Sequence, residues 1–287
     1  MLRRSLAVLA ALAAALFVVS LAAAATGRSG RVHAVPSRIV SLSPTATEDL
    51  FAIGAGPQVI AVDDQSNYPK QAPRTALSGY TPNVEAIAAY RPDLVVVSNG
   101  GPFVSQLERL GIRVLVEPAA ENLAQAYEEI RQLGRVTGHV KKAAAVVRSM
   151  QRQLKQVIQS VPRARRHLSV YHELDQTYYS ATTDTFIGRI YKLFGFRDIA
   201  DGADPTGSGY PQLSGEYILA QNPDIIVLAD SKCCGQNEQT VAARPGWQNL
   251  AAVRNHRVIA VDDDIASRWG PRIVQFARAV AAIAKRG

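Results

Sequence analysis

The chain has few of the residues that build metal centres. Its 287 residues include only two cysteines and five histidines. Two adjacent cysteines cannot provide the four ligands of a structural zinc or iron–sulfur site. The histidines are scattered without ligand spacing; they are His33, His139, His167, His172 and His256. The sequence therefore predicts no metal site and no resident cofactor.

The motifs of common enzyme classes are also missing. No Gly-x-Ser-x-Gly turn presents a nucleophile, and no glycine-rich phosphate loop follows a first strand. Ser43, His172 and Asp175 could be combined into a triad, but three such residues occur by chance in a chain of this length. We predict a protein that is not an enzyme, with a secreted hydrolase as the weaker alternative.

The net charge of +8 raises the question of a nucleic-acid partner. The basic residues are spread along the chain, with a local concentration only around residues 148–166. There, a helix and the segment after it would carry these charges exposed to solvent. We therefore expect no nucleic-acid partner.

The two cysteines, Cys233 and Cys234, are neighbours in the sequence. Neighbouring α-carbons lie ~3.8 Å apart, below the usual range for a disulfide. Oxidation is nevertheless feasible outside the cytoplasm. Two interpretations stay open: a vicinal disulfide that forms a rigid turn beside a ligand, or two half-buried thiols in a glycine-containing loop.

The first residues have the pattern of an export signal. Arg3 and Arg4 precede an uncharged run over residues 5–25, and the small residues Ala23 and Ala25 offer a cleavage site. The run is also long enough to span a bilayer uncleaved. We expect a signal peptide over residues 1–25 and a linker over residues 26–37. The protein would then lie in the periplasm or at the outer face of the cell membrane, retained there if the segment stays uncleaved.

From residue 38 onward, short apolar runs alternate with helical segments, as in parallel sheets. Strands are predicted at residues 38–42, 59–62, 94–97 and 114–116, and helices at 44–53, 84–90, 102–110 and 124–133. Residues 140–161 carry apolar side chains at helical spacing, from Val140 through Val147 to Leu154. The pattern predicts two α/β lobes, residues 38–137 and 163–287, joined by one long helix within residues 138–162.

An internal repeat supports the two-lobe interpretation. Residues 83–96 and 214–227 align at a distance of 131 residues, with identical Glu, Ile, Ala, Pro and Asp. Turn chemistry alone could produce the shared Pro-Asp. It does not explain Glu85 and Glu216, which stand at the same distance before each Pro-Asp.

These features together resemble the iron-siderophore, haem and cobalamin class of ABC-importer binding proteins. The resemblance rests on residues 38–48 with Gly54, on Tyr68-Pro69, and on the two repeat copies with the Tyr210-Pro211-Gln212 segment. It implies two Rossmann-like lobes, a class III periplasmic binding protein, with ligand in the cleft between them. It also implies ABC permease and ATPase subunits as partners, with Glu85 and Glu216 docking onto arginines of the permease. A free monomer is expected.

Among members of that class, the cobalamin-binding proteins are the most similar. The resemblance implies ligand contacts by Asp64, Tyr68, Tyr210, Asp264 and Arg268. Tyr210 stands where a tryptophan is familiar, and Ser98 stands where another is expected. A cobalamin-like ligand is therefore predicted, with haem or a ferric siderophore as alternatives of the same class. Haem would need a Tyr or His ligand, but Tyr171 and His172 lie in a strand-like run whose side chains we expect to alternate between core and surface.

Overall fold

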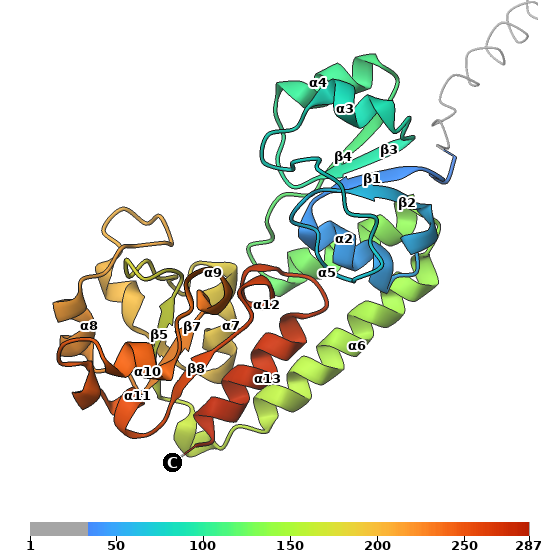
Figure 1. Ribbon diagram of the computed structural model, residues 1–287. Helices are drawn as coiled ribbons and strands as arrows, with labels where there is room; N and C mark the ends of the chain where they lie inside the picture. Colours follow the sequence, from blue (N-terminus) through green and yellow to red (C-terminus); the bar gives the residue numbers. More distant parts are fainter. Residues whose placement is uncertain (1–33, 287) are drawn as a thin grey trace, which may run out of the picture. The chain divides into compact units, whose positions relative to one another are not determined.

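Two four-stranded parallel sheets form the centre of the fold in the computed structural model, which describes residues 34–286 (Figure 1). The predicted signal peptide and most of the linker lie outside the described residues. The first sheet has the order β2-β1-β3-β4 and the second β6-β5-β7-β8. The strands are β1 (Ile39–Leu42), β2 (Val59–Val62), β3 (Leu94–Val97), β4 (Arg113–Val116), β5 (Ser169–Glu173), β6 (Arg197–Asp198), β7 (Ile225–Leu228) and β8 (Val258–Ala260).

Helices flank both sheets. Those of the first half are α2 (Pro44–Ala52), α3 (Val84–Ala89), α4 (Pro102–Arg109) and α5 (Leu123–Val136). Those of the second half are α7 (Phe186–Phe194), α8 (Gly215–Gln221), α9 (Ser231–Cys234), α10 (Glu238–Ala242), α11 (Ala251–Arg254), α12 (Asp263–Ser267) and α13 (Ile273–Ala284). The predicted α/β fold with two parallel-sheet lobes is confirmed.

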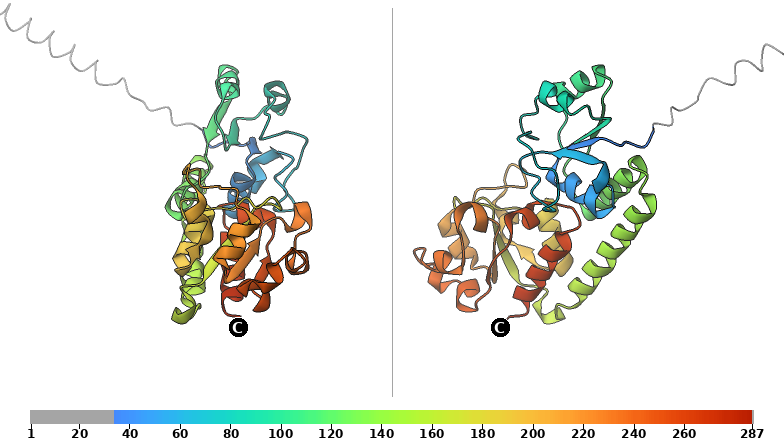
Figure 2. Two further views of the ribbon diagram at one scale, coloured as in Figure 1. Left: turned by 90° about the vertical axis from the view of Figure 1, so that its left-hand side faces the viewer. Right: turned by 45° about the vertical axis from the view of Figure 1, so that its right-hand side comes forward.

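The 20-residue helix α6 (Val140–Gln159) follows the first sheet and precedes the second. Its buried face consists of Ala143, Val147, Met150 and Leu154, whereas Val140 is exposed. The sequence pattern therefore placed the start of the apolar stripe slightly wrongly. The buried face packs against α5 and α13, and α6 runs beside α13 in Figure 1 and in the right-hand view of Figure 2.

The repeat in the sequence corresponds to equivalent local structure. Oδ2 of Asp93 accepts hydrogen bonds from the backbone N and Oγ of Ser37, and Oδ2 of Asp224 accepts the same pair from Ser169. In each case the aspartate fixes the start of one strand to the start of its neighbour. Each Pro-Asp therefore stands at the same place in its sheet, directly before β3 in the first and directly before β7 in the second.

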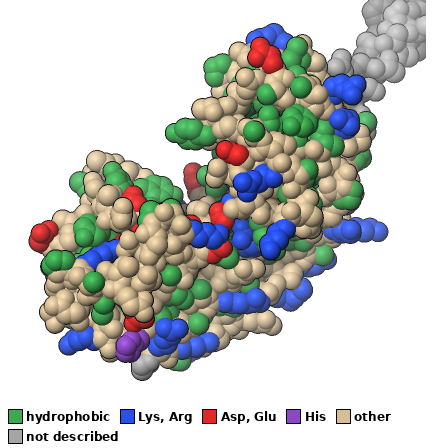
Figure 3. Space-filling view, viewed as in Figure 1, with side chains coloured by type: hydrophobic (Ala, Val, Ile, Leu, Met, Phe, Trp, Pro, Cys, Tyr) green, Lys and Arg blue, Asp and Glu red, His purple; other side chains and the backbone are tan. Residues whose placement is uncertain are grey.

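Basic side chains are distributed over the face seen in Figure 3, several of them along the edge where α6 runs. On α6 the exposed basic residues are Lys141, Lys142, Arg148, Arg152 and Lys155. They lie on the side of the helix opposite its buried stripe. This arrangement is typical of a solvated amphipathic helix.

Candidate functional site

A pocket of about 290 Å³ lies among loops from both halves of the chain. Tyr210, Phe186 and Trp269 contribute its aromatic side chains, and Glu121 and Asp184 are the charged residues in its lining. The segment at residues 119–121 follows the carboxyl end of β4. Ligands of open α/β sheets bind at this edge.

A second pocket of about 270 Å³ shares Ser267 and Trp269 with the first. Asp264 and Arg268 line this second pocket together with Ser98. The two pockets therefore meet at the segment between α12 and α13. Of the five predicted ligand residues, Tyr210 lines the first pocket, and Asp264 and Arg268 line the second.

The donors of Arg268 are committed to protein groups. Its Nη1 donates to Oε1 of Glu48 at 2.9 Å, and its Nη2 donates to Oδ1 of Asp264 at 2.7 Å and to the carbonyl oxygen of Gln65 at 3.0 Å. The residue is only 8% exposed. Arg268 and Asp264 thus brace the loops of the site, and a direct ligand contact by either side chain remains a prediction.

The other two predicted residues lie elsewhere. Tyr68 is 43% exposed and lies under the guanidinium of Arg272, whose central carbon is 4.2 Å from the ring centroid. It lines a separate pocket with Glu48 and Phe51. Asp64 is exposed in the loop that follows β2. The structure does not bring Asp64 or Tyr68 into the lining of the pocket that holds Tyr210.

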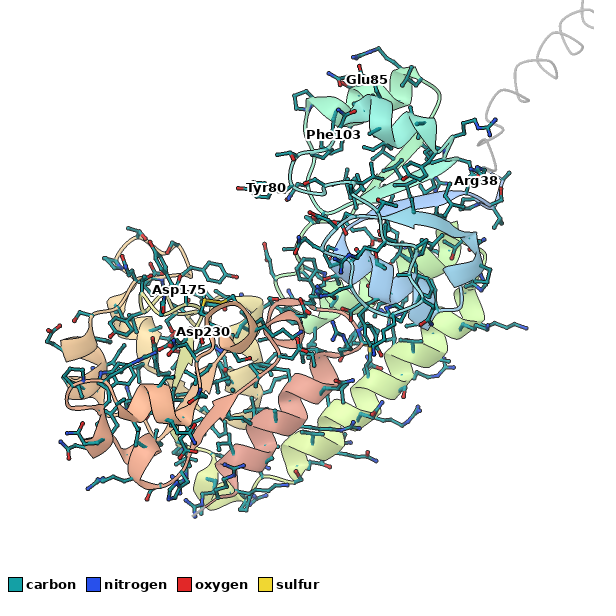
Figure 4. The ribbon with its side chains drawn as sticks, in the orientation of Figure 1. Arg38, Tyr80, Glu85, Phe103, Asp175 and Asp230 are labelled. Carbon is teal, nitrogen blue, oxygen red and sulfur yellow. A yellow bond between two sulfur atoms is a disulfide. The ribbon has the colours of Figure 1, made fainter. Side chains whose placement is uncertain are left out.

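Two aromatic residues, Tyr80 and Trp269, were not selected from the sequence. Tyr80 is 94% exposed, and its side chain extends away from the first sheet (Figure 4). A Cβ on the preceding Gly79 would lie 2.3 Å from the carbonyl oxygen of Leu42, so only glycine lets this loop rest on the end of β1. The other is Trp269. An aromatic residue in a loop has no periodic pattern, so the sole signal was its position beside residues already selected.

An acidic cluster, Asp49, Glu117 and Glu129, lies beneath Trp269. The indole Nε1 of Trp269 donates to Oε2 of Glu129 at 2.6 Å. Burial raises the pKa of Glu129 to about 7, although the indole bond opposes the shift, and burial and the nearby Glu129 raise the pKa of Glu117 to about 8. Burial, with the neighbouring carboxylates, also raises the pKa of Asp49 well above its usual range. Near neutral pH, Glu117 is therefore mainly protonated and Glu129 partly protonated.

Tyr171 and His172 are both fully buried, so the expected alternation between core and surface was wrong. β5 is an interior strand, covered on both faces, and all five of its residues are buried. Nδ1 of His172 lies 2.7 Å from the hydroxyl of Tyr191, and burial lowers the pKa of His172 to about 3. Neither residue can reach a ligand in the pocket without a rearrangement of the core.

Comparison with known proteins decides the family. Residues 39–265 match the family model of periplasmic binding proteins. The chain belongs to the periplasmic binding protein family.

Several relatives of this binding protein have names that state a transport role or a ligand. An uncharacterised ABC transporter substrate-binding lipoprotein of Bacillus subtilis is 33% identical over 250 residues, which cover 84% of this chain and 77% of that protein. A cobalamin-binding protein of Halobacterium salinarum is 32% identical over 249 residues, covering 84% and 67%. The crystal structure of a periplasmic haem-binding protein of Vibrio cholerae superposes with a TM-score of 0.76 at 23% identity, covering 86% and 98%. At that identity, the structural likeness supports the fold alone.

The two repeat glutamates of this binding protein lie at equivalent places. Glu85 is the second residue of α3 and Glu216 the second residue of α8, and both are exposed. Figure 4 shows Glu85 at the far end of its lobe. Both helices begin at a capping side chain, from Asn83 and from Ser214. The structure thus presents one acidic side chain from the first turn of a helix on each lobe.

The structure places Cys233 and Cys234 in a vicinal disulfide within α9. It lies near the labelled Asp175 and Asp230 (Figure 4). Cys233 is exposed and Cys234 partly buried. The neighbouring Lys232 donates from Nζ to Asp262 and to Asp264, which links α9 to the start of α12. Among residues 34–286, no helix combines the length and the apolar character needed to cross a bilayer.

Proposed function

We propose that this protein is the substrate-binding component of an ABC importer and that its ligand is cobalamin or a related corrinoid. The observation that carries the proposal is the composition of the pocket: aromatic walls from Tyr210, Phe186 and Trp269, with Glu121 and Asp184 as its charged lining residues. Such walls suit a flat macrocycle rimmed with amides. The cobalamin-binding relative from Halobacterium salinarum supports the same ligand class.

The charges at the site disfavour an anionic ligand. A ferric siderophore that is anionic would need clustered arginine or lysine side chains. Arg268 and Arg272 are close to the site, but Glu48 binds both of them and Asp264 binds Arg268. The carboxylates of Glu121 and Asp184 would repel an anion in the first pocket. A neutral or weakly cationic ligand fits these charges better.

Haem is the alternative ligand. Tyrosine can ligate haem iron, and Tyr210 and Tyr80 are both well exposed. The fold shared with the haem-binding protein of Vibrio cholerae is compatible with this alternative. The acidic lining of the pocket argues against it, because haem carries two propionates.

The visible absorption spectrum of the protein purified from its own host without added ligand tests the proposal. A corrin, a porphyrin and a ferric siderophore absorb differently, and native mass spectrometry gives the mass of the bound molecule. We expect a corrinoid spectrum and a mass increase of one corrinoid per chain. A porphyrin or siderophore spectrum would contradict the corrinoid proposal.

Two features of the transport role are part of the same proposal. Glu85 and Glu216 each form a charge-assisted pair with a basic residue of the permease once ligand has stabilised the closed state. The protein acts outside the cytoplasm, either released after Ala25 or retained by its N-terminal segment.

A further inference from the structure

We propose that Trp269 is a ligand-binding residue of this site and that Glu129 positions it, an inference that rests on the proposed corrinoid function. Trp269 lines both pockets, so its indole stands where they meet. Tyr210 and Phe186 line the first of these pockets with it. A ligand that fills the first pocket would therefore contact the indole as well as Tyr210.

The ring of Trp269 is held in place by a hydrogen bond. Its Nε1 donates to Oε2 of Glu129 on α5 at 2.6 Å. The ring is partly buried, and it packs against the large apolar core. Rotation of the indole out of the pocket would break the bond to the carboxyl group of Glu129, which lies in a poorly solvated position. Such a loss is unfavourable when the abandoned group stays buried.

The backbone around Trp269 is also fixed. Arg268 and Arg272, on either side, both bind the buried carboxylate of Glu48 on α2. A Cβ on Gly270 would lie 3.3 Å from Oδ1 of Asp49, so this segment rests closely against the same helix. Contacts with Glu48 and Asp49 on α2 and with Glu129 on α5 thus fix the position of the indole before any ligand binds. Such preorganisation lowers the entropic cost of binding.

The chemistry of the indole defines the ligand class. It offers a broad apolar face, and stacking of this face on a conjugated ring stabilises a complex beyond the area that it buries. Its only donor is already bound to Glu129, so it cannot hydrogen-bond a polar ligand. Trp269 therefore recognises the face of a flat macrocycle. It adds a third aromatic face to those of Tyr210 and Phe186 in the first pocket.

The first test uses fluorine NMR on protein labelled with 5-fluorotryptophan. The chain has two tryptophans, and Trp247, which is 2% exposed, lies in the core around β7. Trp269→Phe assigns the two signals by removing one. We expect added cyanocobalamin to shift the Trp269 signal and to leave the Trp247 signal in place. Saturable binding of cyanocobalamin without a shift at Trp269 would overturn the inference.

The second test measures the Kd for cyanocobalamin by equilibrium dialysis, with thermal unfolding as a check on folding. We expect Trp269→Ala to weaken binding about tenfold or more, and Trp269→Phe about threefold or less, because phenylalanine keeps an aromatic face. Glu129→Gln retains an acceptor for the indole and should bind nearly as the unaltered protein does. Glu129→Ala should bind more weakly at a similar unfolding temperature. The matched control is Leu110→Ala, which changes an exposed apolar residue at the end of α4 in the first lobe.

The two possible failures are distinct. If the unaltered protein binds cyanocobalamin but Trp269→Ala binds it equally well, the role of Trp269 is wrong and the proposed function stands. If the unaltered protein binds none of cyanocobalamin, hemin and ferrichrome, the proposed function falls and the inference falls with it.

Discussion

Arg268 donates a hydrogen bond from Nη1 to Oε1 of Glu48 at 2.9 Å, although 220 residues separate the two in the sequence. Arg272 binds the same carboxylate, with its Nε 2.8 Å from Oε2. The side chain of Glu48 is 1% exposed, and those of the two arginines are 8% and 10% exposed. This buried cluster connects α2 of the first lobe to the segment that carries Trp269.

Removal of Glu48 should destabilise the protein strongly. Glu48→Ala leaves two poorly solvated guanidinium groups without their shared carboxylate, and breaking a buried pair typically costs ~3–5 kcal/mol. Urea unfolding of the purified variant measures the loss. Glu128→Ala is the matched control, since Glu128 pairs with Arg131 and Arg135 at the exposed surface of α5. It should cost less than about 1 kcal/mol, and equal losses in the two variants would show that the buried cluster contributes no more than a surface pair.

The proposed docking glutamates should affect transport without affecting ligand affinity. Glu85→Lys combined with Glu216→Lys replaces attraction to basic permease residues with repulsion. We expect uptake of cobalamin into proteoliposomes that contain the partner transporter to be abolished, with the Kd for cyanocobalamin unchanged within twofold. Glu108→Lys reverses an exposed charge on α4, outside the repeat. It should leave uptake intact, and loss of ligand binding in the double variant would refute the docking role.

Stability should fall as the pH rises from 6.5 towards 8. Burial raises the pKa of Glu117 and Asp198 to about 8, and that of Glu129 and Asp230 to about 7. The ordinary values are 4.5 for glutamate and 3.8 for aspartate, so near pH 7 the unfolded chain has released protons that the folded chain still binds. The resulting stabilisation is complete below the ordinary values and is lost as the pH rises through 7 and 8.

Thermal unfolding at pH 6.5, 7.25 and 8 checks this expectation. His172 opposes this trend only slightly, because its pKa is lowered from 6.5 to about 3 and the imidazole of the unfolded chain has lost most of its proton by pH 7.25. We expect a melting temperature several degrees lower at pH 8 than at pH 6.5. Glu117→Gln removes one of the titrating groups and should reduce the slope. An unchanged melting temperature across this range would contradict the burial of these carboxyls.

The vicinal disulfide should be present in the exported protein and should contribute little stability. Cys233 and Cys234 are the only cysteines, so any disulfide within the chain joins these two. The entropic stabilisation grows with the length of the closed loop, and neighbouring residues enclose almost none, which limits it to about 1 kcal/mol. Mass spectrometry after alkylation should find no labelled thiol without reductant and two with it. Two labelled thiols in unreduced protein would rule out the bond.

The fold could be predicted because its determinants are local and repeated. Apolar runs of four residues marked β2, β3 and β7, and the 131-residue repeat showed that two lobes use the same unit. The buried face of α6 was predicted slightly out of place, because a helix rich in alanine and valine has an ill-defined apolar stripe. The buried state of His172 was missed because a short strand does not reveal whether one or both of its faces are covered.

The site was predicted only in part, because its residues meet through tertiary contacts. Tyr210 was selected from its segment and does line the pocket. The bonds of Arg268 to Glu48 and Gln65 span more than 200 residues, and no spacing in the sequence indicates them. Trp269 lies in a loop without periodicity, so its link to Glu129 became visible only in the structure.

Competitive calorimetry with cyanocobalamin, hemin and ferrichrome tests the central claim most directly. The purified protein would be titrated with each ligand alone and then with cyanocobalamin in the presence of each competitor. We predict one cyanocobalamin per chain, bound more tightly than hemin or ferrichrome and displaced by neither at equal concentration. Tighter binding of hemin or ferrichrome, or displacement of cyanocobalamin by either, would contradict the assignment of this site to a corrinoid.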